Sequence, residues 1–143
     1  MSLFVIDASV AAKWFLPAAN EPLTDEALEL LKQYANGRVR FVVPDLFWAE
    51  FANLLWKAVR HGRCTRRSAE SAIAALKNRR LTTVPSQALV EQAFGIAVAF
   101  ERTVYDSLYV ALAVDLRGHL ITADERLANA LAAHLPVKWL GAL

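Results

Sequence analysis

Short apolar segments alternate along this chain with segments of helical spacing, and this alternation restricts the possible folds more than any other feature. The apolar segments predict strands over residues 3–7, 39–43, 81–84, 120–122 and 137–140. The helical spacing predicts helices over residues 8–16, 22–35, 45–61, 65–76, 86–100, 104–116 and 124–134. Strands separated by helices of this length favour parallel pairing with helices on both faces. The expected fold is therefore a three-layer α/β/α fold with a small, mainly parallel central sheet.

Proline and capping residues mark several of the predicted boundaries. Pro17 follows the first predicted helix and should end it. Asp45, Thr65 and Ser86 are each placed to cap the helix that follows, because their short polar side chains can accept hydrogen bonds from free backbone amides. No linker, repeat or low-complexity segment interrupts the pattern, so residues 1–143 are predicted to form a single domain.

The composition restricts the location and the surface of the protein. Hydrophobic residues make up 56% of the chain and the mean hydropathy is +0.29, both high for a soluble protein. No stretch reaches the roughly 18 uninterrupted apolar residues of a membrane span, since Glu101, Arg102 and Asp106 interrupt residues 93–114. The N-terminus has no basic region and meets Asp7 too early for a signal peptide. We expect a cytoplasmic protein whose surface is partly covered by a partner or a second copy.

Four acidic residues interrupt apolar sequence at positions that suggest chemistry. Asp7 and Asp124 follow predicted strands, and open parallel sheets place functional groups at the carboxyl ends of strands. Asp106 opens the most apolar predicted helix, and Glu50 lies in an apolar run whose only polar neighbour at helical spacing is Asn53. Carboxylates in such surroundings are costly to desolvate unless they are paired, hydrogen-bonded or bound to a metal. A Glu50 exposed at the mouth of a cleft would avoid that cost.

Three of these acids also have a purely structural interpretation at the start of a helix. Asp7 could cap the first helix, and Asp106 suits the positive end of a helix dipole. Thr122 and Glu125 have the spacing of a capping box around Asp124. Taken one at a time, these acids therefore do not establish a functional site.

Taken together, the four acids favour a divalent-metal site. Two like charges about 4 Å apart repel by roughly 4 kcal/mol at an effective dielectric constant near 20, and a bound cation turns this repulsion into coordination. Oxygen donors favour Mg²⁺ or Mn²⁺, and none of the three histidines is spaced with the acids as in a zinc site. Two other acid-dependent classes lack their motifs here. A haloacid-dehalogenase-like phosphatase needs an Asp where Ser9 stands, and a phospho-receiver domain needs adjacent acids after the first strand.

Basic residues are concentrated in one part of the chain, although the formal net charge is only +2. They are Lys57, Arg60, His61, Arg63, Arg66 and Arg67, followed by Arg79 and Arg80. Such a group is either the solvated surface of two helices or a contact for a phosphate backbone. Beside a carboxylate metal site, Arg63, Arg66 and Arg67 are candidate substrate-binding residues. Cys64 is the only cysteine, which excludes an internal disulfide and a cysteine-based zinc cluster, and its context assigns it no role.

The segments around the four acids closely resemble, in this order, those of the PIN-domain nucleases and in particular the VapC-type toxins of prokaryotic toxin–antitoxin systems. The matching segments are residues 5–9, 44–53, 105–113 and 120–127. Any one of them is a weak signal, whereas the four in order along nearly the whole chain are specific. Residues 57–87 carry no such motif and give no information about the substrate.

The resemblance implies a metal-dependent endoribonuclease that forms a homodimer and is blocked by an antitoxin. The acidic quartet that would bind Mg²⁺ or Mn²⁺ and carry out catalysis consists of Asp7, Glu50, Asp106 and Asp124. Ser9 and Thr122 would be polar helpers that hold a ligand or a water. Two alternatives remain open: an RNA-processing or structure-specific DNA nuclease on the same fold, and a non-catalytic scaffold that binds RNA. The sequence does not specify the RNA, the number of metal ions or the antitoxin.

Overall fold

A computed structural model describes residues 1–143 and contains five strands and seven α-helices. The strands are β1 (Ser2–Ile6), β2 (Val39–Pro44), β3 (Thr82–Val84), β4 (His119–Thr122) and β5 (Val137–Trp139). The helices are α1 (Ala8–Ala12), α2 (Thr24–Ala35), α3 (Leu46–Arg60), α4 (Arg66–Asn78), α5 (Val90–Phe100), α6 (Val104–Asp115) and α7 (Glu125–Leu131). Three short 3₁₀ helices are η1 (Ala18–Asn20), η2 (Ser86–Leu89) and η3 (Leu140–Ala142).

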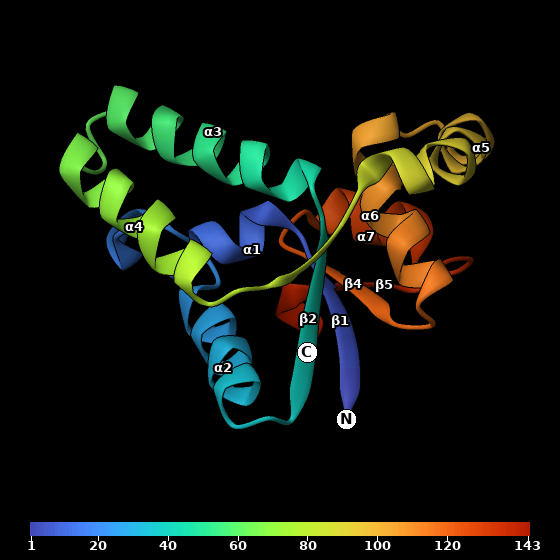
Figure 1. Ribbon diagram of the computed structural model, residues 1–143, viewed down its shortest axis with the longest axis horizontal. Helices are drawn as coiled ribbons and strands as arrows, with labels where there is room; N and C mark the ends of the chain where they lie inside the picture. Colours follow the sequence, from blue (N-terminus) through green and yellow to red (C-terminus); the bar gives the residue numbers. More distant parts are fainter.

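The strands form one sheet in the order β3-β2-β1-β4-β5, and every pair of neighbours is parallel. Helices α1 to α4 lie on one side of the sheet and α5 to α7 on the other (Figure 1). The prediction of a three-layer α/β/α fold around a small parallel sheet is therefore confirmed.

The order of the strands places the carboxyl ends of β1 and β4 beside one another at the centre of the sheet. Val5 of β1 is opposite Val42 of β2 on one side and Leu120 of β4 on the other. The chain builds outward from β1 through β2 and β3, and then returns to the other side of β1 with β4 and β5. Open α/β sheets bind ligands outside the carboxyl ends of the strands, at the point where the strand order reverses. Here that point lies between β1 and β4.

The sheet and the helices share one continuous apolar core. In α6 every residue from 107 to 113 is buried, which explains why this helix is apolar around its whole circumference. In α5, by contrast, Val90, Phe94 and Val98 are exposed at a spacing that places them on one face. No helix combines the length and the apolar character that crossing a membrane requires.

Two helices end earlier than their sequence pattern predicted. α1 ends at Ala12 rather than at Leu16, and residues 13–16 continue as hydrogen-bonded turns up to Pro17, whose ring disfavours helical backbone in Leu16. α7 ends at Leu131 rather than at His134, because the chain turns back there toward β5. The apolar periodicity continues through both turns, so it does not locate these ends.

A long-range contact replaces two of the three predicted helix caps. Asp45 precedes α3, but its carboxylate accepts hydrogen bonds from the N–H (3.0 Å) and the hydroxyl of Ser86 rather than from amides of α3. Asp45 thus holds the predicted N-cap position of α3 without a side-chain cap bond, whereas Ser86 begins η2 and does not cap α5, so the Ser86 prediction was wrong. The two residues meet because β2 and β3 are neighbours and end together. Thr65 does cap α4, as predicted, by accepting a hydrogen bond from the Ser68 N–H at 3.1 Å.

Gly118 lies between α6 and β4, where the backbone packs against β1 too closely for a side chain. A Cβ atom at this position would lie 2.5 Å from the carbonyl oxygen of Leu3. We therefore expect Gly118→Ala to lower the free energy of unfolding, measured in urea, by about 1–3 kcal/mol. Gly95→Ala is the matched control, because a Cβ at this position in α5 meets nothing within 4 Å. The control should stabilise the protein by about 0.5–1 kcal/mol, and equal losses in both variants would contradict the packing argument.

Candidate active site

Asp7 lies at the carboxyl end of β1, where the strand passes directly into α1. Its Oδ1 caps α1 by accepting a hydrogen bond from the Ser9 N–H at 3.2 Å. Its Oδ2 accepts a hydrogen bond from the Thr122 hydroxyl at 2.8 Å and so joins the end of β1 to the end of β4. The helix-cap interpretation of Asp7 is confirmed, but capping occupies only one of the two oxygens. Each oxygen also keeps a lone pair that can bind a further group.

Ser9 and Thr122 hold the ends of β1 and β4 together. The buried Thr122 hydroxyl donates to Asp7 and accepts a hydrogen bond from the Asp124 N–H at 3.0 Å. Ser9 Oγ accepts a hydrogen bond from the Ala123 N–H at 3.4 Å. Asp124, and not Thr122, caps α7 through an amide of its first turn, so the capping box does not form. Both residues expected as polar helpers therefore lie beside Asp7.

Glu50 approaches the same end of the sheet from α3. Its Oε1 accepts a hydrogen bond from the Tyr109 hydroxyl at 2.5 Å. Tyr109 lies in α6, and only 2% of its surface is exposed, so this contact joins the two helix layers across the sheet. Asn53, which the sequence offered as the polar neighbour of Glu50, is exposed instead.

The other two acids open helices at the same end of the sheet. Asp106 is half-buried in the first turn of α6, where its N–H donates to the Thr103 hydroxyl at 3.1 Å. Asp124 is exposed at the start of α7. Asp106 therefore does lie at the positive end of a helix dipole, as its structural interpretation required.

Burial raises the pKa of Asp7 to about 6, and the nearby negative charges of Glu50 and Asp106 add to this increase. The hydrogen bonds from Thr122 and Ser9 oppose it without cancelling it. A carboxyl group whose pKa is raised in this way lacks a compensating positive charge. Asp7 therefore has a strong electrostatic preference for either a proton or a cation.

Glu50 and Asp106 show the same effect. Burial raises the pKa of Glu50 and the charge of Asp106 adds to it, whereas the Tyr109 hydrogen bond opposes the increase. Burial and the charge of Asp124 raise the pKa of Asp106, and the nearby Thr103 side chain and the charge of Arg102 oppose this increase. The charges of the four acids therefore act on one another at this end of the sheet.

The chemistry of the acidic quartet fits a hard divalent cation. The ion pairs of this structure join Lys13 and Arg63 to Glu21 and Arg66 to Glu70, so no basic side chain is paired with the quartet. All of the donor atoms are oxygens, which Mg²⁺ and Mn²⁺ prefer. No three of the acids are close enough in this structure to hold one ion together. Coulomb repulsion acts over longer distances than coordination bonds, so acids that do not share one ion directly can still raise one another's pKa.

The three arginines predicted to bind substrate lie in different places. Arg63 lines a pocket that also contains Ser9. Arg66 is exposed on α4 and forms an ion pair with Glu70 at 3.3 Å, while the exposed Arg67 lies in a shallow hollow with Phe15. Only Arg63 therefore shares a hollow with a residue of the candidate site.

Sequence reasoning missed two features of this region. Tyr109 is three residues after Asp106, a spacing that places both on one side of a helix, and this signal could have identified it. Glu21 binds both Lys13 and Arg63, and nothing in the sequence connects these three residues.

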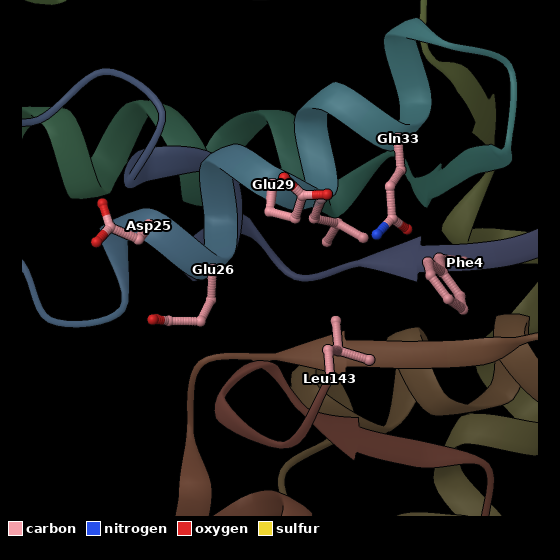
Figure 2. Close-up of a pocket in the computed structure, with 7 residues that line it drawn as sticks. Phe4, Asp25, Glu26, Glu29, Gln33 and Leu143 are labelled. Atoms are coloured by element: carbon pink, nitrogen blue, oxygen red, sulfur yellow. The ribbon is translucent and has the colours of Figure 1, made fainter.

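A second pocket, of about 410 Å³, lies away from the quartet beside α2 (Figure 2). Its charged lining residues are Asp25, Glu26 and Glu29, all from α2, and no basic residue lines it. Phe4 of β1 and Leu143 form its opposite side. Such a lining repels a phosphate-containing ligand.

The PIN domain family matches residues 4–131. Ribonuclease VapC3 from Pyrobaculum aerophilum is 30% identical to this chain over 131 residues, which are 90% of this chain and 95% of that protein.

Solved structures share the fold at low sequence identity. PAE2754 from Pyrobaculum aerophilum superposes with a TM-score of 0.68 at 20% identity, over 99% of this chain and 91% of that chain. VapC20 from Mycobacterium tuberculosis, a sarcin-ricin loop cleaving toxin, gives a TM-score of 0.65 at 20% identity, over 94% of this chain and 96% of that chain. A toxin–antitoxin complex from Klebsiella pneumoniae gives a TM-score of 0.63 at 16% identity, over 96% of this chain and 96% of that chain.

The raised pKa of Asp7 predicts how the stability of the metal-free protein depends on pH. The folded protein keeps a proton on Asp7 up to about pH 6, whereas the unfolded chain loses it near pH 3.8. The stability contributed by protonated Asp7 is therefore complete below pH 3.8 and is lost as the pH rises through 6. In EDTA, Asp7→Asn should unfold at a higher temperature than the wild type at pH 8, and this difference should vanish near pH 4.

Asp45→Asn is the control of opposite sign for that experiment. Hydrogen bonds from Ser86 hold the pKa of Asp45 below its usual range, so ionised Asp45 favours the folded state. This variant should unfold at a lower temperature than the wild type at pH 8. A melting curve of Asp7→Asn that follows the wild type at every pH would refute the electrostatic account of the site.

The hydrogen bond between Tyr109 and Glu50 leads to a separate prediction about the pKa of Glu50. Because the hydrogen bond from Tyr109 lowers the pKa of Glu50, Tyr109→Phe should raise it further. The titration can be followed by the ¹³C chemical shift of the Glu50 carboxyl group in metal-free protein. Tyr105→Phe removes an exposed hydroxyl from the same helix and should leave the Glu50 titration unchanged. Identical shifts in the two variants would show that the hydrogen bond does not act on Glu50.

Proposed function

This chain belongs to the PIN-domain family, and from that premise we propose that it is a metal-dependent endoribonuclease, the toxin of a toxin–antitoxin pair. One structural observation carries the proposal: Asp7, Glu50, Asp106 and Asp124 lie at one end of the sheet with no basic partner, and the pKa of Asp7 is raised to about 6. The relation to Ribonuclease VapC3 over nearly its whole length supports RNA as the substrate.

Asp7 and Asp106 would be the main ligands of a Mg²⁺ or Mn²⁺ ion. Both are at least partly buried, and each carries a raised pKa that a cation would lower again. When bound, such an ion lowers the pKa of a water molecule and stabilises the negative charge that develops on the phosphate during hydrolysis. No side chain is required as a covalent nucleophile.

The remaining residues would orient this centre. Thr122 fixes one oxygen of Asp7, and Ser9 fixes the other through its N–H, so the carboxylate cannot rotate freely. Tyr109 fixes Glu50 in the same way. Glu50 and the exposed Asp124 would then complete the ligand set or hold water near the scissile phosphate. Preorganised groups of this kind lower a barrier because they need no rearrangement during the reaction.

We expect two protein partners. The toxin–antitoxin complex from Klebsiella pneumoniae shares this fold, which supports a cognate antitoxin for this chain. The exposed apolar residues Val90, Phe94 and Val98 on α5 are consistent with the homodimer that the sequence resemblance implies. We place the protein in the cytoplasm, where its RNA substrate would be.

Cleavage assays test the proposed function directly. Purified protein without antitoxin should cut total RNA or tRNA into discrete fragments in Mg²⁺ or Mn²⁺, but not in EDTA. Asp7→Asn and Asp106→Asn should each lower the rate by roughly 100-fold or more, because each removes a charged ligand. Asp115→Asn is the matched control, since Asp115 is exposed at the other end of the same helix as Asp106.

Each possible result of the assay separates the proposal from an alternative. Full activity in both quartet variants would remove the metal-site interpretation. Cleavage of single-stranded or branched DNA in place of RNA would favour a DNA nuclease. RNA binding without cleavage in the presence of Mg²⁺ or Mn²⁺ would favour a non-catalytic RNA-binding scaffold.

A further inference from the structure

A basic pocket of about 320 Å³ extends from the quartet along α1 toward the end of α3. Ser9, whose N–H donates to Asp7, lines it beside the candidate active site. The charged or titratable side chains that line it are Lys13, Glu21, Lys57, His61 and Arg63. Because Ser9 lines the basic pocket and also donates to Asp7, the basic pocket adjoins the quartet.

One carboxylate organises the cations of the basic pocket. Lys13 Nζ lies 2.9 Å from Glu21 Oε2, and only 6% of the Lys13 side chain is exposed. Arg63 Nη2 lies 2.5 Å from the other oxygen, Glu21 Oε1, and also donates to the carbonyl oxygen of Asn20 at 3.2 Å. Two cations are thus held in fixed positions by a single acid. Ion pairs with this degree of burial are maintained only when their geometry is well satisfied.

The basic pocket nevertheless has unbalanced charge and an unsatisfied donor. Lys13, Lys57 and Arg63 supply three positive charges against the one negative charge of Glu21, which leaves two in excess. Arg63 Nε is buried and has no hydrogen-bond partner in the protein. An anion with several oxygens would balance this excess of positive charge and would offer an acceptor to the unsatisfied Arg63 donor.

We propose that the basic pocket binds a phosphodiester group of the RNA substrate, next to the phosphodiester group that is cleaved in the same strand. This inference rests on the proposed ribonuclease function, because it requires one RNA strand to contact both the basic pocket and the quartet. The quartet repels phosphate unless a cation is bound, whereas the basic pocket attracts phosphate without any metal. The pocket beside α2, lined by acids, has the opposite charge, so the strand would run along α1 and α3. Of the three arginines predicted from sequence, Arg63 alone lines this path.

Lys57 gives the cleanest test, because it is exposed and makes no ion pair within the protein. Binding is measured in EDTA, in an Asp106→Asn background that does not cleave, to a short fluorescent single-stranded RNA of mixed sequence at a series of NaCl concentrations. We expect Lys57→Gln to weaken binding about fivefold. The slope of log K against log salt should shrink by about 0.7, which corresponds to one lost phosphate contact on a single strand. Lys57→Arg should retain most of the affinity.

Lys32→Gln provides the matched control, since Lys32 is an exposed lysine on α2, away from the basic pocket, and should change neither affinity nor slope. In cleavage assays on the wild-type background, Lys57→Gln should raise KM and leave kcat nearly unchanged.

The outcomes distinguish a failure of the phosphate-site proposal from a failure of the proposed function. If Lys57→Gln binds RNA as the parent does while the wild type cleaves RNA, the phosphate site is wrong and the proposed function stands. If the wild type cleaves no RNA in either metal, the proposed function fails and the phosphate site with it. If Lys57→Gln weakens binding of a glutamate-rich peptide but not of RNA, the pocket receives an acidic protein segment and the proposal is overturned.

Discussion

The hydrogen bond from the Thr122 hydroxyl to Asp7 Oδ2 is the contact on which the rest of the candidate site depends. It joins the ends of the two central strands at the point where the strand order reverses. Because Thr122 is fully buried, its hydroxyl must find partners inside the protein, and it finds them in Asp7 and the Asp124 N–H. One buried side chain therefore fixes the relative positions of two members of the quartet.

Without a bound cation, the four acids of the candidate site lower the stability of the folded protein. Burial and mutual repulsion raise the pKa of Asp7, Glu50 and Asp106, so each carboxylate is less stable when charged than it would be in water. The scaffold tolerates this cost because the fully packed α6 and the Tyr109 hydrogen bond hold the acids in place. Functional sites commonly lower the stability of a fold in this way. A divalent cation would remove the repulsion and supply the reactivity together.

The fold, and the positions of the acids in the candidate site, could be predicted from local patterns. Alternating apolar segments gave the layers and the parallel sheet, and the position of Asp7 and Asp124 after strands placed them at the edge where ligands bind. The failures involve contacts between distant residues. Asp45 and Ser86 bond to each other across neighbouring strand ends, and Tyr109 replaces Asn53 as the partner of Glu50. Local propensity cannot register such contacts, because the partners are about 40 and 60 residues apart.

The sequence by itself determined the helices and strands, because these follow from periodicity. It also determined the four acids and the chemical class of the cation they suit, because these follow from the charge and donor atoms of single residues. Only the tertiary structure decided which polar groups meet. It brought Thr122 to Asp7, Tyr109 to Glu50, and Lys13 and Arg63 to one oxygen each of Glu21. Those pairings depend on the order of the strands and on the packing of helices on both faces, which set distances between residues far apart along the chain.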